Sequence, residues 1–256
     1  MDLTDNQWAI AQPLIPKPLK RADGHGRPRR DDRQIRNGIL WIRRMGAPWK
    51  DRPEQYPSCQ TRHRRFQEWV GAGVFERILQ KLARNLKERG GLDLSQCCID
   101  DHLASPERGL EGGKTKRGKG SKLMAVDDRA GLPIVICVGS AAPHEVTLVE
   151  PTREVRFLEE RPERLIGDKA SDSDSLDQRL TEPGVHRMAP HPEDRKKAAT
   201  PDRCPWRSYK RRWKVERLFA WLQNFRQIAV RYERHVQNYL GLVQLGRIVI
   251  LLRHYF

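Results

Sequence analysis

A single carboxylate stands in the most cationic segment of the chain. Between Arg203 and Tyr232 there are nine lysines and arginines and one acidic residue, Glu216. A lone carboxylate in such a segment is either the ion-pair partner of a neighbour, here Arg212 or Arg217, or a hard oxygen ligand for a divalent cation that acts on phosphate. The second interpretation requires more carboxylates elsewhere in the chain.

Two aspartates that follow short apolar runs with strand character meet this requirement. Asp100 ends the run that starts at Gln96, and Asp168 follows the run at 164–167. Side chains at strand ends share one edge of a sheet, and a helix packed across that edge can add Glu216. Three such carboxylates repel one another unless cations neutralise them. Two Mg²⁺ ions about 4 Å apart would do so and would stabilise both the attacking and the leaving oxygens of an in-line phosphoryl displacement.

We therefore expect a two-magnesium site, in which Mn²⁺ can substitute, with Asp100, Asp168 and Glu216 as its ligands. Three nearby aspartates compete for this role, and each also has a plain structural interpretation as a turn or helix-capping residue. They are Asp101, Asp172 and Asp174.

The segment around Glu216 has the pattern of a helix. Apolar side chains recur at three- and four-residue spacing from Val215 to Ala229 and form one stripe. Glu216 lies beside this stripe, on the same side as Arg212 and Gln223. The pattern predicts that Glu216 points toward the packed body of the domain.

The overall charge indicates a polyanionic partner. The 256 residues include 49 lysines and arginines against 33 aspartates and glutamates, a formal charge of +16. For such a chain we expect nucleic acid as the partner. The five cysteines are odd in number and show no C-x-x-C spacing, which fits a reducing cytoplasm. The most apolar stretch, 239–252, is too short to span a bilayer, so we expect a buried helix and no membrane partner.

Residues 1–90 have helical patterns throughout. Thr4 and Gln7 form a capping box, and a second helix ends at Gly46. A basic helix at 60–69 completes what resembles a helix-turn-helix DNA-binding region; a small helical bundle with a solvated basic face is the alternative. The candidate DNA contacts of this region are Arg27, Arg29, Arg30, Arg62, Arg64 and Arg65.

Beyond residue 92 the pattern becomes strand-like. Runs at 122–126 and 132–138 flank a turn at 127–131, which predicts an antiparallel hairpin. A loop at 105–120, rich in glycine, either follows a phosphate backbone or is a flexible linker; its cations are Lys114, Lys116, Arg117 and Lys119. The expected fold is α/β, with a helical region at 1–90 and a catalytic domain with a mixed sheet at 95–256.

Several short motifs add a family resemblance. Those at 3–8, 26–32, 37–41 and 46–49 lie in the amino-terminal region, and those at 131–133, 143–145 and 165–169 lie in the strand-rich part. The residues Tyr209, Arg212 and Glu216 match the spacing Y-(2)-R-(3)-E. With these motifs, the chain resembles the DDE transposases of bacterial insertion sequences, of the IS-five type, nearly from end to end.

The resemblance implies a function and a site. It implies an RNase H-like catalytic domain in which Asp100, Asp168 and Glu216 are the catalytic, metal-binding triad, and it favours the metal-ligand role of Glu216 over the ion pair. Tyr209 and Arg212 then become candidate DNA contacts. The implied activity is binding of the terminal inverted repeats of an insertion sequence, magnesium-dependent strand cleavage and strand transfer into target DNA. Two protomers are expected in the synaptic complex because two ends must be joined.

Four positions depart from the family pattern. Gln223 stands where a lysine or arginine is usual, Ser171 where a tyrosine is usual, and Asp101 and His102 follow Asp100 where small residues are usual. These positions concern phosphate contact and packing near the metals. The alternative function is therefore a catalytically weakened or inactive copy that acts only as a sequence-specific DNA-binding protein.

Overall fold

The amino-terminal part of the protein is helical, as predicted. The structure is a computed structural model, and it describes residues 3–17, 28–51, 53–106, 113–115, 118–142, 160–168, 184–188 and 209–255. The amino-terminal elements are α1 (Asp5–Ala11), the 3-10 helix η1 (Gln12–Leu14), α2 (Asp32–Met45), α3 (Cys59–Gly71) and α4 (Val74–Glu88).

Local signals set the ends of these helices. The Thr4 hydroxyl accepts a hydrogen bond from the Gln7 backbone, and the Gln7 side chain accepts one from the Thr4 backbone, so the predicted capping box is confirmed. Helix α2 ends at Gly46, whose φ of 67° is the left-handed conformation that glycine adopts readily.

The strands form a mixed sheet. They are β1 (Cys97–Pro106), β2 (Gly113–Thr115), β3 (Gly118–Asp127), β4 (Pro133–Ser140), β5 (Arg164–Ile166), β6 (His186–Met188) and β7 (Val230–Arg231). The main order is β4-β3-β1-β5-β6, while β2 pairs with β3 and β7 pairs with β1. The predicted hairpin of β3 and β4 is confirmed as antiparallel, and β1, β5 and β6 run parallel. The short strands β2, β6 and β7 carry too few residues to show a pattern in the sequence.

One strand boundary differs from the expectation. Asp100 does not end its strand, because β1 continues to Pro106. The pairing of β1 with β3 extends from Cys98 opposite Asp127 to Ala104 opposite Ser121, and this partner keeps the polar half of β1 extended. Asp100 therefore lies within the sheet.

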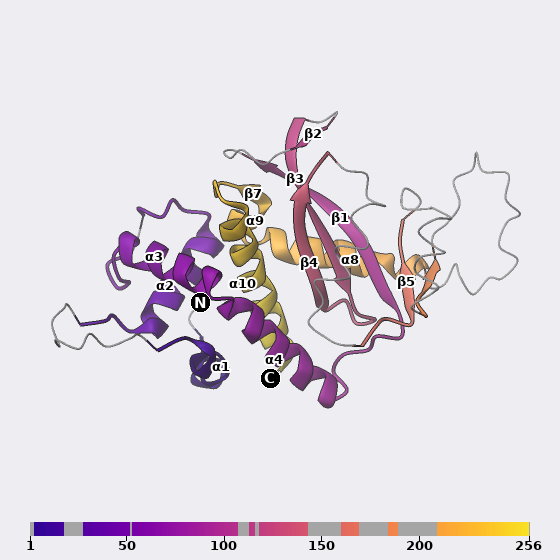
Figure 1. Cartoon of the computed structure of the whole chain (residues 1–256), viewed down its shortest axis with the longest axis horizontal. Helices are drawn as coiled ribbons and strands as arrows, with labels where there is room; N and C mark the ends of the chain where they lie inside the picture. The colour runs from indigo at the N-terminus through magenta and orange to yellow at the C-terminus, as the bar shows by residue number, and fades with distance from the viewer. Residues whose placement is uncertain are drawn as a thin grey trace, which may run out of the picture.

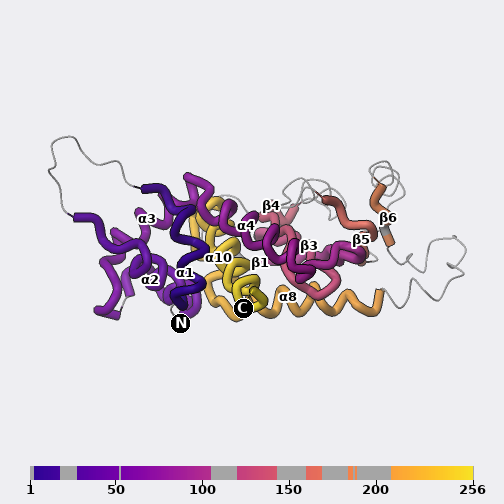
Figure 2. The backbone as a smooth tube through the Cα atoms, turned by 90° about the horizontal axis from the view of Figure 1, so that it is seen from below, coloured from indigo at the N-terminus to yellow at the C-terminus, as the bar shows by residue number. Residues whose placement is uncertain are grey.

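The carboxyl-terminal helices cover one face of the sheet. After the 3-10 helix η3 (Lys210–Arg212), the elements are α8 (Trp213–Gln223), α9 (Arg226–Ala229) and α10 (Val236–Tyr255). The stripe predicted as one helix to Ala229 is thus divided, since Phe225 adopts an extended conformation and buries its ring. Helix α8 runs along the sheet against β1 and β3 (Figures 1 and 2).

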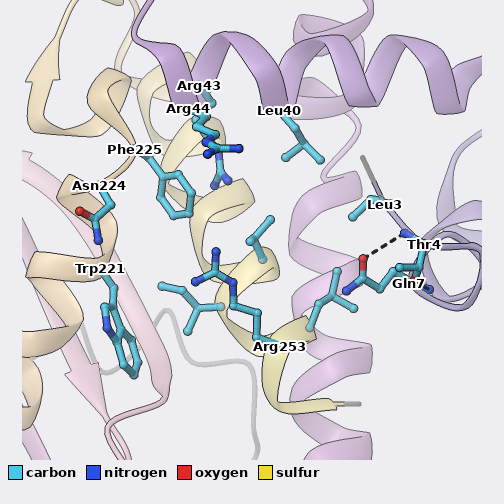
Figure 3. A pocket seen from close by; sticks show the side chains of 13 residues that line it. Leu3, Thr4, Gln7, Leu40, Arg43, Arg44, Trp221, Asn224, Phe225 and Arg253 are labelled. Atoms are coloured by element: carbon cyan, nitrogen blue, oxygen red, sulfur yellow. Dashed lines mark hydrogen bonds between the residues drawn. The ribbon is translucent and has the colours of Figure 1, made fainter. Parts of the chain in front are cut away.

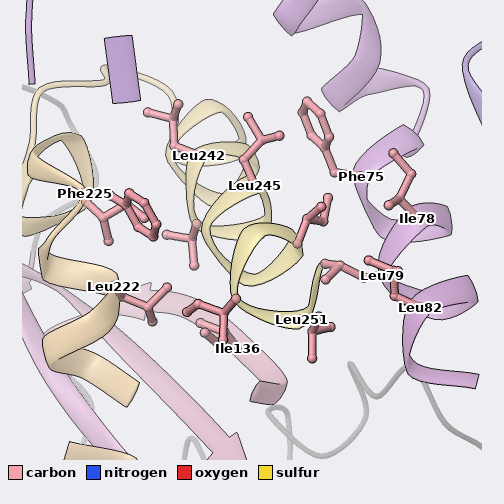
Figure 4. Packing of buried hydrophobic residues seen from close by; sticks show 14 of the residues in the cluster. Phe75, Ile78, Leu79, Leu82, Ile136, Leu222, Phe225, Leu242, Leu245 and Leu251 are labelled. Carbon is pink, nitrogen blue, oxygen red and sulfur yellow. The ribbon is translucent and has the colours of Figure 1, made fainter. Parts of the chain in front are cut away.

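Helix α10 is the centre of the core. It lies between the amino-terminal helices and the sheet (Figure 1), and it is buried on nearly all sides, as predicted for this stretch. Figure 4 shows its leucines between side chains of α4 and residues from α8 to α9. A Cβ at Gly241 would lie 2.5 Å from Val70 Cγ2, so only glycine allows α10 to approach α3 this closely. No described helix is long and apolar enough to cross a membrane.

Consequently, the two parts of the chain share one core. A single cluster of buried apolar side chains extends from Leu3 in the amino-terminal region to Leu252 in α10 and includes Ile136 of the sheet. A second, smaller cluster lies on the opposite face of the sheet, around Ile99 and Val126.

Candidate catalytic site

Two of the three predicted carboxylates follow paired positions of neighbouring parallel strands. In the register of β1 and β5, Cys97 lies opposite Leu165 and Cys98 lies opposite Ile166. Asp100 and Asp168 each come two residues after the last of these pairs. The strands run in the same direction, so the register brings both aspartates to the same level of the sheet.

A cation lies beside Asp100 and within electrostatic range of Asp168. Arg212 Nη2 donates a 2.7 Å hydrogen bond to Asp100 Oδ2, and both side chains are mostly buried. Burial lowers the pKa of Arg212, but the charge and hydrogen bond of Asp100, a hydrogen bond to Tyr209 and the charge of Asp168 raise the pKa above its ordinary value. Burial raises the pKa of Asp100, and Arg212 opposes this effect. The two aspartates thus make a local site of negative potential that attracts a positive group.

Strand alternation separates Asp100 from its neighbour Asp101. Cys98 and Ala104 of β1 belong to the large cluster under the helices, so Asp100 faces the same side, toward α8. Asp101 faces the opposite side and pairs with Lys122 at 3.2 Å. Asp101 therefore does not share the site of Asp100, although the sequence left both open as ligands.

Helix α8 presents one face to β1. The ring of Phe219 lies 5.5 Å from that of His102, and Gln223 Nε2 hydrogen-bonds to His102 Nε2 at 2.7 Å. Two of the departures from the family pattern, His102 and Gln223, are therefore partners of each other. Together with Arg212 on Asp100, these contacts align α8 along β1.

Glu216 lies on this face of α8, four residues after Arg212 and three before Phe219. Its side chain is exposed, so the expectation that it points into the packed body was wrong. The physical reason is that Val215 and Leu218 fill the core beneath the helix. This leaves Glu216 at the open margin beside β1.

The ion-pair alternative for Glu216 is not formed. Arg212 binds Asp100, while Arg217 donates to the carbonyl oxygen of Ala130 at 2.9 Å and stacks over the ring of Trp221. Within the described part of the chain, Glu216 has neither a hydrogen-bond partner nor a salt bridge. A carboxylate surrounded by cations but bonded to none of them retains its oxygens for another ligand.

The donor chemistry suits a hard divalent cation, but the described residues do not form a closed metal cage. Among them, no group of three or more histidine, cysteine, aspartate or glutamate side chains is close enough to hold a metal ion. The guanidinium of Arg212 takes the position of a cation on Asp100. The carboxylates of Asp100, Asp168 and Glu216 are of the oxygen-ligand type that Mg²⁺ prefers, but in this structure the three do not lie close enough together to share an ion.

The turn between β3 and β4 anchors α8, a role that sequence patterns did not reveal. Asp128 Oδ1 accepts hydrogen bonds from the backbone of Ala130 and Leu132. Two cations of α8, Lys214 and Arg217, donate to carbonyl oxygens of this turn. The neighbouring Asp127 is fully buried and accepts a 3.0 Å hydrogen bond from the Cys98 backbone. Burial raises the pKa of Asp127 to about 7.

The structure divides the predicted DNA contacts of α3. Arg62 is fully buried and donates to the carbonyl oxygens of Gly38 and Trp49 at 3.3 Å, so its assignment as a DNA contact was wrong. The sequence contains a signal for this: Arg62 shares the helical face of Phe66 and Trp69, which follow it by four and seven residues. Arg64, on the other face, is 73% exposed.

The other arginines predicted to contact DNA differ in their burial and in their ion pairs. Arg65 is mostly buried and pairs with Glu68, Arg29 pairs with Asp32, and Arg30 is exposed. Several predicted positions lie outside the described residues or have side chains outside them, namely Arg27, Lys114, Lys116, Arg117, Lys119, Ser171, Asp172 and Asp174.

Arg62 and Arg64 provide a matched pair of substitutions. We expect Arg62→Ala to lower the free energy of unfolding by about 3 kcal/mol, because it leaves a cavity and removes two hydrogen bonds that a buried side chain makes. Arg64→Ala is expected to change stability by less than about 0.5 kcal/mol and to reduce the salt dependence of DNA binding by about one unit of slope. Urea unfolding and binding titrations at several salt concentrations measure both. A stable Arg62→Ala protein with the weaker DNA binding would reverse the two roles.

Comparison with known protein families gives two matches along the chain. The model of the IS4/5 transposase family matches residues 3–79, and the model described as "Transposase DDE domain" matches residues 93–251. A 16.2 kDa protein of insertion element IS402 from Burkholderia cepacia is 31% identical over 101 residues, which are 38% of this chain and 69% of that protein. A protein from the same organism, named as a transposase for insertion sequence element IS402, is 28% identical over 135 residues, covering 50% of this chain and 60% of that protein.

A solved structure supports the fold. The piggyBac transposase, in a synaptic complex with hairpin DNA, superimposes with a TM-score of 0.53 and 9% identity over 96% of this chain and 71% of that chain. The mixed sheet in the order β4-β3-β1-β5-β6, with helices on its face, is the predicted RNase H-like fold, which is thereby confirmed. With a DDE-domain match over more than half of its length, the chain belongs to the family of DDE transposases, as its sequence motifs predicted.

Proposed function

We propose that this chain binds the terminal inverted repeats of its insertion sequence and catalyses metal-dependent strand cleavage and strand transfer, with Asp100, Asp168 and Glu216 as the metal ligands. The observation that carries the proposal is the parallel register of β1 and β5, which aligns the two aspartates, with Arg212 drawn to them. Membership of the DDE family agrees with this assignment.

Each side chain of the proposed site has a separate role. Mg²⁺ bound at the three carboxylates would polarise the scissile phosphate and stabilise the attacking and leaving oxygens. Burial raises the pKa of Asp100, and the guanidinium of Arg212 beside it opposes this rise. Arg212, once displaced from Asp100, remains at the same margin and can donate two parallel hydrogen bonds to a DNA phosphate. Tyr209, whose hydrogen bond helps hold Arg212, orients that guanidinium.

The DNA partner follows from the charge of the whole chain. A net charge of +16 favours a long phosphate backbone, and the exposed Arg30 and Arg64 lie on the amino-terminal helical region that would hold the ends. The proposed division into an end-binding region at 1–90 and a catalytic domain at 95–256 follows the two family matches. Joining two ends requires two active sites, so the proposed synaptic complex contains a homodimer.

The direct test is cleavage by the purified full-length chain. A duplex that carries the terminal repeat is expected to be nicked at the repeat boundary in Mg²⁺ or Mn²⁺ and to stay intact in EDTA. A scrambled repeat of the same length serves as the control. Binding of the repeat without metal-dependent nicking would instead support the alternative, a copy that only binds DNA.

The departure at Gln223 gives a prediction of increased activity. Gln223 lies over His102, two residues along β1 from Asp100 on the same face, so a cation at position 223 lies within reach of a phosphate held at the site. We expect Gln223→Lys to raise single-turnover nicking about tenfold, equivalent to about 1.4 kcal/mol of transition-state stabilisation. Gln223→Met, which has similar length and no charge, is the control. Equal rates for the lysine and methionine variants would mean that this position does not contact the phosphate.

A further inference from the structure

A pocket of about 450 Å³ lies away from the carboxylates, where the amino-terminal segment, α2, the end of α8 and α10 meet (Figure 3). Trp221, which lines it, comes nine residues after Arg212. At 1.5 Å per residue this places Trp221 roughly 14 Å along α8 from Arg212, and neither Arg212 nor Asp100 lines the pocket. The pocket is therefore separate from the proposed catalytic site.

Among the described residues, three arginines and no acidic residue line this pocket. They are Arg43 and Arg44 of α2 and Arg253 of α10. Figure 3 shows Arg253 and the two α2 arginines pointing toward one another across the space. Burial, and then repulsion from the charges of Arg36 and Arg253, lowers the pKa of Arg43 to about 9. Three cations that converge without a carboxylate make a site for an anion.

Arg43 is the strongest indication of a missing partner. Its side chain is 2% exposed, and its guanidinium lies 3.5 Å from the ring centroid of Phe225. Among the described residues, its Nε and Nη1 have no hydrogen-bond partner. A buried charge with unfilled donors is unfavourable unless a bound group supplies the acceptors.

The rest of the pocket is apolar. Leu40, Phe225 and Ile250 form much of its wall, and the indole of Trp221 stands at one side. The volume lies within the range typical of small-molecule sites, in which apolar walls surround a few polar groups that fix orientation. An ion as small and as hydrated as inorganic phosphate would fill the arginine end only.

We propose that this pocket binds a phosphate ester of nucleotide size, with the phosphate at Arg43, Arg44 and Arg253 and the ring of the ligand against Trp221 and the aliphatic wall. A free nucleotide and a nucleotide of a DNA strand share this chemistry. The proposal does not depend on strand cleavage, since the arginines and the pocket lie apart from the carboxylates.

Calorimetric titration of the full-length chain with thymidine monophosphate, thymidine and inorganic phosphate, at fixed ionic strength, tests the proposal. We expect the nucleotide to bind at least tenfold more tightly than inorganic phosphate, and thymidine to bind far more weakly than the nucleotide. Arg44→Gln and Arg253→Gln, at the exposed rim, are expected to weaken nucleotide binding at least tenfold each. Arg84→Gln, an exposed change on α4, controls for net charge and is expected to bind like the wild type.

A second pair of variants separates binding from folding. Arg36 and Arg43 are both buried on α2, and both have guanidinium nitrogens without hydrogen-bond partners among the described residues, but only Arg43 lines the pocket. Both Arg36→Met and Arg43→Met are expected to fold, because each removes a buried unpaired charge. Only Arg43→Met should lose the rise in Tm that the nucleotide produces in the wild type.

Equal nucleotide binding by the wild type, Arg43→Met and Arg253→Gln would overturn the proposal, as would equal affinities for the nucleotide and inorganic phosphate. Competition distinguishes the two sources of the ligand. A short single-stranded oligonucleotide that displaces thymidine monophosphate from the wild type, but does not bind tightly to Arg43→Met, would assign the pocket to a DNA strand. Nucleotide binding that the oligonucleotide leaves unchanged would assign it to a free nucleotide.

Discussion

Replacing Asp168 with alanine is expected to lower single-turnover cleavage of an end-containing duplex at least about a thousandfold, equivalent to about 4 kcal/mol of transition-state stabilisation. The same substitution should leave binding of the duplex nearly unchanged, because affinity comes from phosphate neutralisation by cations elsewhere in the chain. The expectation follows from the register that aligns Asp168 with Asp100. Gel-based cleavage and binding assays on the same preparations measure both effects.

Asp101 provides the control for this experiment. It is adjacent to Asp100 in sequence, but it faces the other side of the sheet and pairs with Lys122. Asp101→Ala is expected to cleave within about threefold of the wild-type rate. If Asp168→Ala cleaved normally, or if Asp101→Ala lost as much activity as Asp168→Ala, the assignment of the triad would be wrong.

A buried carboxyl group beneath α8 predicts an unusual dependence of stability on pH. Burial raises the pKa of Asp127 to about 7, and the nearby charge of Asp128 adds to this effect, while the Cys98 hydrogen bond and Lys214 oppose it. In the unfolded chain the pKa of an aspartate is about 3.9. Between these two values the folded state holds a proton that the unfolded state has released, so stability falls as pH rises from about 4 to about 7.

The predicted size of this effect is about 4 kcal/mol, from a separation of about three pKa units. Asp127→Asn removes the titration and keeps an oxygen that can accept the Cys98 hydrogen bond. We expect the free energy of unfolding of the variant to rise relative to that of the wild type as pH rises from 4 to 8, by up to about 4 kcal/mol. Urea unfolding at each pH measures this difference. Parallel stability curves for the two proteins would show that Asp127 is ionised in the folded state throughout this range.

The elements that depend on local patterns could be predicted from the sequence. The capping box of α1, the end of α2 at Gly46, the hairpin of β3 and β4 and the buried α10 all follow from spacing and turn residues. Boundaries that depend on tertiary pairing could not be predicted. Asp100 lies inside β1 because β3 pairs beyond it, and the helix after Val215 breaks because the Phe225 ring enters the core.

In the candidate site, too, local sequence patterns predict some features, and tertiary contacts determine the others. Motif spacing predicts the three carboxylates, and strand alternation places Asp101 on the other face of the sheet, where it pairs with Lys122. The ion pair of Arg212 with Asp100 joins residues 112 positions apart, which no local pattern reveals. The burial of the α2 arginines could not be predicted from the sequence either. Arg43 has the sequence context of a solvated cation, and it is buried because α10 packs against it.

The central claim is that Asp100, Asp168 and Glu216 together bind divalent metal, and metal-directed cleavage of the protein backbone tests it most directly. Fe²⁺ that replaces Mg²⁺ generates hydroxyl radicals in the presence of ascorbate and peroxide, and these cut the chain next to the bound ion. We expect cuts near residues 100, 168 and 216, all suppressed by excess Mg²⁺ and all lost in Asp168→Ala. Cuts elsewhere, or cuts near residue 100 that persist in Asp168→Ala, would contradict a shared metal site.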